Sequence, residues 1–280
     1  MGAPDERDSR QQLSRALARV LRDGALAALA TVVSAPDEET TAHDLRAGAK
    51  LLVEETGATA GTTGDAGLDE RVAAHALAFL ASRTEARTYF VNEFAPERAE
   101  LRGARVMFER VEPEPHVVVC GAGHVGAALA RLASALGYRV TLIDDREDFV
   151  APERFRDANV RLVAAPNWTE PVREAIGAGR NVSVAVVTRG HNEDEECLRA
   201  VLRARPDYVG MIGSRRRTNI VLARLRGDGF AEEELREVRA PVGLDIGSVT
   251  PEEVALSILA EIVARRRGGT GRPLSAWRRE

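Results

Sequence analysis

A glycine-rich segment carries the clearest chemistry in this chain. Residues 117–120 (Val-Val-Val-Cys) run directly into Gly121-Ala-Gly-His-Val-Gly126, which has the G-x-G-x-x-G spacing. In such a loop the first glycine permits a tight turn, the second lets a phosphate approach backbone N–H groups, and the third lets the following helix pack on the strand. We therefore predict an anion site the size of a phosphate at Gly121, Gly123 and Gly126. His124 inside the loop is either a structural residue or a ligand contact.

A carboxylate follows the next predicted strand at the distance expected for a dinucleotide fold. The strand 139–143 ends at Asp144, which lies 18 residues after Gly126 (144 − 126). In dinucleotide-binding proteins an acid near this position binds the ribose 2′-OH. Asp144 therefore favours an unphosphorylated ribose, as in NAD or FAD, whereas Arg146 would tolerate a 2′-phosphate.

A second loop with candidate chemistry contains His191 and Asp194, directly after a predicted strand. Residues three apart lie on one face of a helical turn, so this pair could be a general acid and base or half a metal site. The alternative is that Asn192 or Asp194 caps the helix and His191 is a polar loop residue. We predict no metal site, because no second His or Cys is placed to complete the ligand shell.

Two further loops could hold an anion. Gly213-Ser-Arg215 opens a predicted helix and is followed by two more arginines, so it either binds a phosphate or a pterin-like anion or is a solvated helix end. The loop 241–247 sets Asp245 between glycines, either as a turn or as a carboxylate held for a ligand. His191 and Asp194 are the only catalytic candidates, because no nucleophile motif stands out.

The elements that must position these loops alternate between strand and helix. The glycine loop leads into a helix with Val125, Leu129, Leu132 and Leu136 on one stripe. Strands are predicted at 117–120, 139–143, 160–164, 182–188 and 208–212, and later helices at 169–176, 192–204, 214–226, 231–237 and from a Thr250 N-cap and Glu253 capping box to 267. Alternation with apolar strands predicts a Rossmann-like parallel sheet with helices on both faces.

Residues 1–111 are predicted to form a smaller α+β domain. Its helices are expected at 10–21 and 68–81, its strands at 27–33, 49–53, 89–91 and 105–108, and its loops at the polar stretch 34–46 and the Gly- and Thr-rich stretch 57–67. Residues 112–115 (Glu-Pro-Glu-Pro) are the predicted linker. The Rossmann-like domain is then 116–267, and 268–280 is expected to be a disordered tail.

Composition limits the classes of partner. The net charge of −4 and the pI near 5.9 disfavour nucleic acid as a partner. No apolar run is long enough to span a membrane, and no signal peptide is recognised. Cys120 and Cys197 show neither zinc nor disulfide spacing, so we expect a cytoplasmic protein.

Five ordered motifs between residues 116 and 267 resemble the XdhC/CoxI family, the accessory proteins of xanthine dehydrogenase and other molybdenum hydroxylases. They are Cys120-Gly-Ala-Gly-His-Val-Gly126, Asp144-Asp-Arg146, Gly190-His-x-x-Asp194, Gly210-Met-Ile-Gly-Ser-Arg215, and 241–247 with Thr250-Pro-Glu-Glu253. The resemblance implies a Rossmann domain behind a smaller domain, commonly as a homodimer. It also implies that the chain binds molybdenum cofactor (molybdopterin), assists its maturation and delivers it to the apo-enzyme.

The N-terminal part departs from that family. The loop that usually carries Ser-Gly-Gly-Cys reads Gly61-Thr-Thr-Gly-Asp-Ala-Gly67, without the cysteine, and 34–46 lacks the usual Gly-Ser-Ser-Pro-like turn. If that thiol handles cofactor or sulfur in relatives, this chain must act differently.

The leading hypothesis is therefore an accessory factor, a binding and delivery protein and not an enzyme, whose partner is a molybdenum hydroxylase apo-enzyme. The alternatives are an NAD(P)-dependent oxidoreductase, in which Asp144 holds ribose and His191 or Asp194 moves a proton, and a nucleotide-sensing regulator. The oxidoreductase is less favoured, because the N-terminal part offers only His43, His75 and scattered acids to face a nicotinamide.

Overall fold

The computed structural model describes residues 6–35, 45–82, 84–156 and 158–275. The chain divides into two compact units, Met1–Pro113 and Glu114–Glu280. Most of the polar stretch predicted at 34–46, His43 included, and the last five residues of the predicted tail lie outside the described residues.

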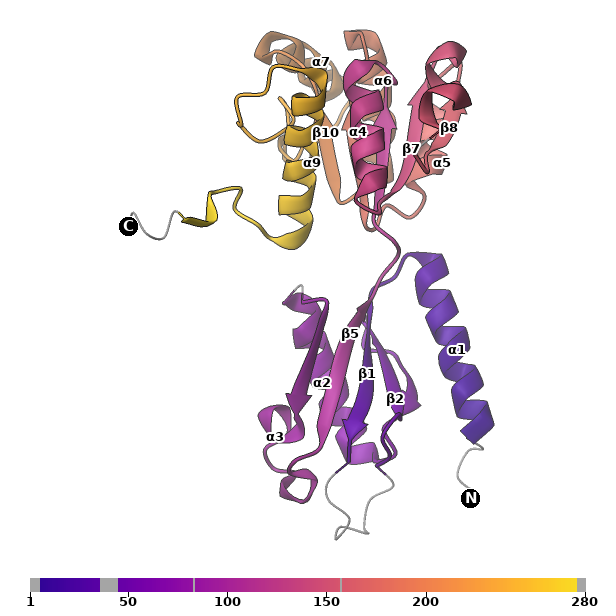
Figure 1. Ribbon diagram of the computed structural model, residues 1–280, viewed down its shortest axis with the longest axis vertical. Helices are drawn as coiled ribbons and strands as arrows, with labels where there is room; N and C mark the ends of the chain where they lie inside the picture. Colours follow the sequence, from indigo (N-terminus) through magenta and orange to yellow (C-terminus); the bar gives the residue numbers. More distant parts are fainter. Residues whose placement is uncertain (1–5, 36–44, 83, 157, 276–280) are drawn as a thin grey trace. The chain divides into compact units, whose positions relative to one another are not determined.

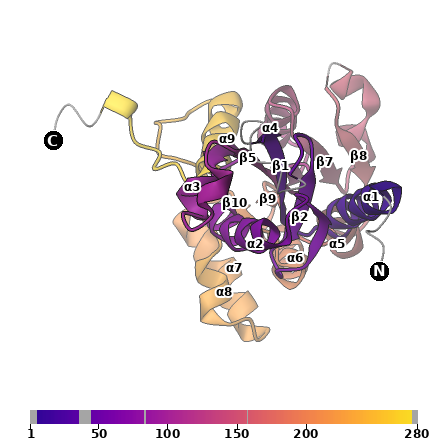
Figure 2. The same ribbon diagram turned by 90° about the horizontal axis from the view of Figure 1, so that it is seen from below.

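The N-terminal unit is an antiparallel sheet with a helix on each face. Its strands follow the order β3-β2-β1-β5-β4. Its elements are α1 (Glu6–Asp23), β1 (Ala27–Ser34), β2 (Lys50–Glu54), β3 (Thr59–Thr62), α2 (Ala66–Ala81), β4 (Ala86–Phe90), α3 (Val91–Phe94), a 3₁₀ turn (Ala99–Leu101) and β5 (Arg105–Val111). Alternate residues of β1 face opposite sides: Ala28 and Ala30 pack with the α2 core and Ala27 with α1, so the two helices cover opposite faces (Figure 2).

One expectation for this unit is wrong. The stretch 57–67 was expected to be a loop, but β3 lies inside it and pairs antiparallel with β2, with Thr59 opposite Val53 and Thr62 opposite Lys50. A four-residue edge strand of Thr, Ala and Gly has no apolar alternation of its own, so only its pairing with β2 makes it a strand.

The C-terminal unit is a parallel sheet with the order β10-β9-β6-β7-β8 (Figure 1), which confirms the predicted Rossmann-like fold. Its elements are β6 (His116–Cys120), α4 (His124–Ala135), β7 (Arg139–Asp144), two 3₁₀ turns (Glu147–Val150 and Pro152–Phe155), β8 (Arg161–Ala164), α5 (Thr169–Ile176), β9 (Val182–Val186), α6 (His191–Ala204), β10 (Tyr208–Met211), α7 (Arg215–Gly227), α8 (Glu232–Arg236) and α9 (Pro251–Arg267).

Helices cover both faces of this sheet. Helices α4 and α9 pack on one face with Val117 and Val119, and α5 to α8 pack on the other with Val118 and Cys120. Because successive residues of β6 point to opposite faces and all five are buried, neither face of this strand is left to solvent.

The stripe predicted for α4 needs correction. Its buried face is made mainly of small residues, and Leu136, expected on that face, is 62% exposed just after the helix ends. Leu129 is buried as predicted, whereas Val125 and Leu132 are only partly buried. Gly126 and the alanines at 127, 130 and 133 let α4 lie close to the sheet and to α9.

The order of the strands identifies the part of the sheet where a ligand could bind. From β6 the chain builds β7 and β8 on one side, then crosses to build β9 and β10 on the other, so the direction of winding reverses between β6 and β9. In open α/β sheets ligands bind beside the carboxyl ends of the strands at this point. We use the name switch edge for three segments at these strand ends. They are the last residue of β7 with the two that follow it (144–146), the loop after β6 (121–126) and the loop after β9 (187–191).

Candidate functional site

Two glycines of the loop are required by packing. Gly121 has φ +112°, and a Cβ there would lie 2.6 Å from the carbonyl oxygen of Val187. A Cβ at Gly126 would overlap the carbonyl oxygen of Gly121, so α4 can start this close to β6 only with glycine.

Gly123 is different, because nothing lies within 4 Å of a Cβ built on it and its φ of −64° is open to any residue. It is the N-cap of α4, and no side chain caps the helix there. The first N–H groups of α4 and the positive end of its dipole therefore adjoin open space beside Gly123. His124, the first helical residue, is exposed. This arrangement can hold a phosphate-sized anion.

Asp144 does not face this space. Its side chain is buried, with Oδ2 accepting from the Ala122 N–H (2.6 Å) and Oδ1 from the Arg146 N–H (2.9 Å). The Arg146 guanidinium adds Nε to Oδ1 (2.8 Å) and Nη2 to Oδ2 (3.0 Å). Two carboxylate oxygens offer about four acceptor positions in all, and these bonds use them. A ribose hydroxyl would have to displace one of them.

These bonds also decide the charge of Asp144. Burial opposes its ionisation, but the guanidinium and the two backbone N–H groups outweigh burial and hold the pKa of the Asp144 carboxyl below its usual range. Asp144 is thus ionised, and its hydrogen bonds link the glycine loop to the end of β7.

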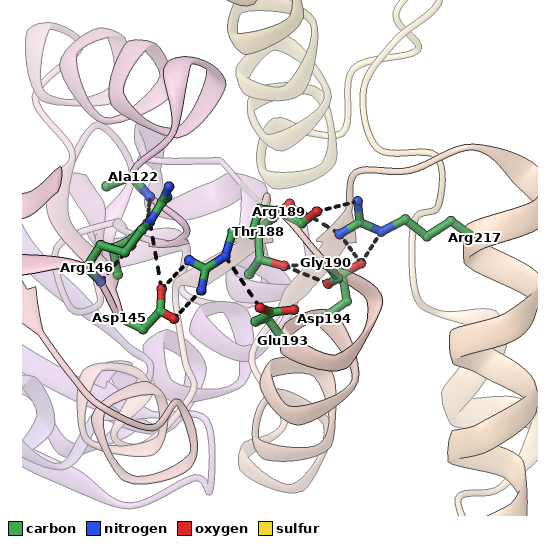
Figure 3. Close-up of polar contacts among 10 residues, drawn as sticks. Ala122, Asp145, Arg146, Thr188, Arg189, Gly190, Glu193, Asp194 and Arg217 are labelled. Carbon is green, nitrogen blue, oxygen red and sulfur yellow. Dashed lines mark hydrogen bonds and ion pairs between the residues drawn. The ribbon is translucent and has the colours of Figure 1, made fainter.

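The structure gives His191 and Asp194 different surroundings. His191 is exposed at the first position of α6, whereas Asp194 is buried and binds the Thr188 hydroxyl (2.6 Å) and Arg217 Nε (2.5 Å) (Figure 3). Asp194 lies on the same stripe of α6 as Cys197, Leu198 and Val201, which fixes its direction toward the core.

Arg217 links α7 to α6 and to the loop after β9 through hydrogen bonds. Besides Asp194, it donates from Nη2 to the carbonyl oxygen of Thr188 (3.2 Å). Burial raises the pKa of Asp194, and the Thr188 hydroxyl and the Arg217 charge offset this only in part. The third arginine of the predicted anion loop therefore has a structural partner.

The remaining residues of that loop are open to solvent. Ser214 is the N-cap of α7 and accepts from the Arg217 N–H (3.3 Å), and Gly213 is partly buried beside it. Arg215 is exposed at the first position of α7. Asp245 is also exposed, in a loop held at Gly243, whose N–H donates to Glu261 (2.7 Å). The predicted capping box that follows is confirmed, because Thr250 accepts from the Glu253 N–H (3.3 Å) and Glu253 accepts from the Thr250 N–H (2.9 Å).

One ion pair was missed by sequence reasoning. Arg189, after β9, makes a two-pronged pair with Asp145, after β7, with both N–O distances 2.6 Å. Figure 3 shows Arg189 between Ala122, Arg146 and Asp145 on one side and the Thr188–Asp194–Arg217 group on the other. The partners are 44 residues apart, so neither periodicity nor motif spacing links them.

The two cysteines are buried in one core cluster, on β6 and α6. Burial raises the pKa of the Cys197 thiol, and its contact with Cys120 adds to the effect, so it stays an unreactive thiol. Within the ranges that the structure describes, no three His, Cys, Asp or Glu side chains are grouped so that they could hold a metal ion.

In the N-terminal unit, the loop 61–67, which lacks the family cysteine, is fixed by hydrogen bonds to two carboxylates. Asp69 accepts from the Thr62 and Thr63 hydroxyls (2.7 and 2.6 Å), and Asp65 caps α2 and pairs with Arg98 (2.7 and 2.9 Å). A Cβ at Gly67 would lie 2.5 Å from Arg98 Nη1. Hydroxyl, carboxylate and guanidinium groups therefore fix this loop.

Together these features define a Rossmann-type domain with an uncapped helix start at its switch edge. A family model for the XdhC Rossmann domain matches residues 117–262, and a second model, for the XdhC and CoxI family, matches residues 20–90. The chain belongs to the XdhC/CoxI family.

The chain is similar to several bacterial proteins, of which three follow. The chain is 32% identical over 232 residues to the uncharacterized protein YqeB of Escherichia coli K12, covering 81% of this chain and 42% of that protein. It is 28% identical to a probable xanthine dehydrogenase subunit of Bacillus subtilis 168 (58% and 46% covered) and 30% identical to the molybdenum cofactor insertion chaperone PaoD of E. coli K12 (39% and 36% covered). The matched segments thus span less than half the length of each relative.

No helix in the described ranges has the length and apolar character that a membrane span requires.

Proposed function

We propose that this chain is an accessory protein that binds molybdenum cofactor and assists its maturation and insertion into a molybdenum hydroxylase of the xanthine dehydrogenase type. Family membership and the chaperone named among its relatives support this role. We include in the proposal that it acts in the cytoplasm, as a homodimer, on the apo-enzyme, and that it binds and delivers without catalysing a reaction.

One observation favours a pterin phosphate over a dinucleotide: Asp144 is turned inward. The helix start at Gly123 suits a phosphate, which both ligands carry, but a dinucleotide also needs an acid for its ribose. The carboxylate at that position uses its acceptor positions on Ala122 and Arg146. A ligand that brings a phosphate and no adenosine ribose therefore fits the residues better.

In this proposal the phosphate of the cofactor lies against the N–H groups of His124 and Val125, with no side chain at Gly123 to exclude it. Arg215 and Ser214 at the start of α7, and Asp245, are the remaining proposed contacts. The cofactor is cargo here, and it brings the molybdenum and the pterin dithiolene that the client enzyme uses. The chain's part is to bind the phosphate, shield the cofactor and release it.

A nucleotide-sensing regulator is the second candidate, and the glycine loop itself supports it. The oxidoreductase alternative has less support, because His191 is exposed and Asp194 is buried against Arg217. Neither is placed as an acid or base beside an anion at Gly123.

The test begins with the purified full chain. It is denatured, and the released small molecules are assayed for pterin fluorescence after oxidation and for NAD and FAD absorbance. Transfer is then measured as hydroxylase activity after mixing cofactor-loaded chain with apo-enzyme. Pterin in the released fraction and gain of activity are expected.

Variants sharpen this test. Arg215→Ala and Asp245→Ala should weaken pterin binding without changing stability, since both side chains are exposed. Arg203→Ala, exposed on α6 away from the switch edge, is the matched control. Tight NAD binding with no affinity for pterin would contradict the proposal and favour the regulator.

A further inference from the structure

Three carboxylate–arginine pairs lie at the switch edge, and their carboxylates differ in burial. The pairs are Asp144–Arg146, Asp194–Arg217 and Asp145–Arg189. Asp144 and Asp194 are 1% and 0% exposed, so removing Arg146 or Arg217 would leave a buried charge without a partner. The Asp145 and Arg189 side chains are 22% and 47% exposed, so water can solvate both groups if they part. Only this third pair can open at low cost.

The position of this pair relates it to the glycine loop. Strands β7 and β9 are the two neighbours of β6, and Asp145 and Arg189 follow their carboxyl ends. The pair therefore spans the end of β6, the strand that leads to Gly121 and Gly123. Neighbouring strands are about 5 Å apart, so a link between β7 and β9 bridges about 10 Å across this end.

Asp145 and Arg189 each lie near a second group of opposite charge, which remains beside them when the pair opens. Arg146 Nε lies 3.9 Å from Asp145 Oδ1, and Glu193 Oε1 lies 3.5 Å from Arg189 Nε. Asp145 can thus rely on Arg146, while Glu193 keeps the Arg189 guanidinium near the switch edge. Opening is a change of partner and leaves neither charge isolated.

We propose that Arg189 is the cationic contact for the ligand phosphate and that Asp145 occupies it until a ligand arrives, so that the site selects a phosphomonoester dianion. This rests on the proposed function and names the chemistry that its ligand must present. The planar guanidinium donates two parallel hydrogen bonds, which suit two phosphate oxygens as well as a carboxylate.

The selection follows from charge. A phosphomonoester has a second pKa near 6 and so carries close to two negative charges at pH 7. It outcompetes the single charge of Asp145 for Arg189. A phosphodiester or a dinucleotide pyrophosphate carries one charge per phosphate, which gives no advantage over the carboxylate.

The test uses small probes and the full chain labelled with ¹⁵N. Methyl phosphate and dimethyl phosphate, a matched monoester and diester, are titrated while the backbone amides of residues 121–126 are followed. Methyl phosphate should bind wild type more tightly than dimethyl phosphate does. Asp145→Asn should tighten methyl phosphate about fivefold, and Arg189→Gln should weaken it about tenfold.

Three controls accompany these variants. Asp148→Asn removes an equal charge from an exposed position three residues away and should bind as wild type does. The double variant should bind as Arg189→Gln alone, since Asp145 acts only through Arg189. Thermal unfolding should place each variant within a few degrees of wild type, because water reaches both side chains of the pair.

The proposal is overturned if Asp145→Asn binds methyl phosphate no more tightly than wild type, if Arg189→Gln binds it equally well, or if both probes bind alike. Molybdenum cofactor, titrated in parallel, separates the two proposals. If methyl phosphate follows the expected pattern but cofactor does not bind, the proposed function fails and the role of Arg189 stands. If cofactor binds equally to every variant, the proposed function stands and the role of Arg189 fails.

Discussion

The contact between α4 and the glycine turn gives the sharpest prediction of stability. In Gly126→Ala the new Cβ would overlap the Gly121 carbonyl oxygen and lie 3.0 Å from its carbon and 3.1 Å from Val187 Cγ2. The first two atoms are backbone, so no change of rotamer relieves the overlap. The turn and the helix would have to part by roughly 1 Å, which also disturbs the close packing of α4 on α9.

Overpacking of this kind costs about 1–3 kcal/mol when side chains yield, and backbone overlap puts the expected loss near the upper end, about 3 kcal/mol. For a unit of this size that lowers the midpoint of thermal unfolding by about 6–12 °C. Gly123→Ala is the matched control, because its Cβ meets nothing within 4 Å and its φ is negative. Its stability should stay within about 1 kcal/mol of wild type.

Trp168 reports the transition. It is buried in the core between the sheet, α5 and α6, and the second tryptophan, Trp277, lies outside the described residues. Unfolding is therefore followed by fluorescence in a Trp277→Phe background. A Gly126→Ala protein that melts within 2 °C (about 1 kcal/mol or less) of the background refutes the overlap reasoning. So does a Gly123→Ala protein that loses as much stability as Gly126→Ala.

The remaining predictions concern charges and caps. Arg217→Leu should cost about 3–5 kcal/mol in urea unfolding, because Asp194 is left buried without its cationic partner. The loss should become smaller as the pH is lowered and the carboxyl takes up a proton. Arg189→Leu should cost less than about 1 kcal/mol, and equal losses for the two variants would contradict this reasoning. Burial, together with the nearby Arg139 and Arg161 charges, lowers the pKa of His116 to about 4 from 6.5. The unfolded chain therefore binds the proton more readily, and the stability that His116 contributes is lost as pH falls from about 6.5 to 4, by about 3 kcal/mol. His116→Gln should flatten the urea midpoint against pH over that range, and an unchanged slope would show that His116 titrates freely. Thr250→Ala should remove the capping bond to Glu253 and cost about 1 kcal/mol, measured by the same unfolding; no change would mean the cap contributes nothing.

Local sequence predicts those elements whose structure depends on residues close together in the chain. The strand 117–120, the glycine loop and the helix capped by Thr250 each combine a period with a stop or start signal within a few residues. β3 could not be found this way, because a four-residue edge strand depends on β2 for its hydrogen bonds.

The direction of a polar side chain was harder to predict than its position. Asp144 has the expected spacing, yet it points at Ala122 and Arg146, and the spacing is the same for either orientation. For Asp194 the sequence does contain a signal, because an acid on the same stripe as Cys197 and Leu198 indicates a buried partner. The pairing of Asp145 with Arg189 joins loops that only the sheet order brings together, so it needs the fold.

Amide hydrogen exchange with and without molybdenum cofactor tests most directly whether the cofactor phosphate binds at the start of α4. The N–H groups of His124 and Val125 should exchange at least about tenfold more slowly when cofactor is bound, since the phosphate accepts from them. Glu252 and Glu253, in the first turn of α9, should exchange at an unchanged rate. Cofactor that binds the full chain without slowing His124 and Val125 would contradict this site.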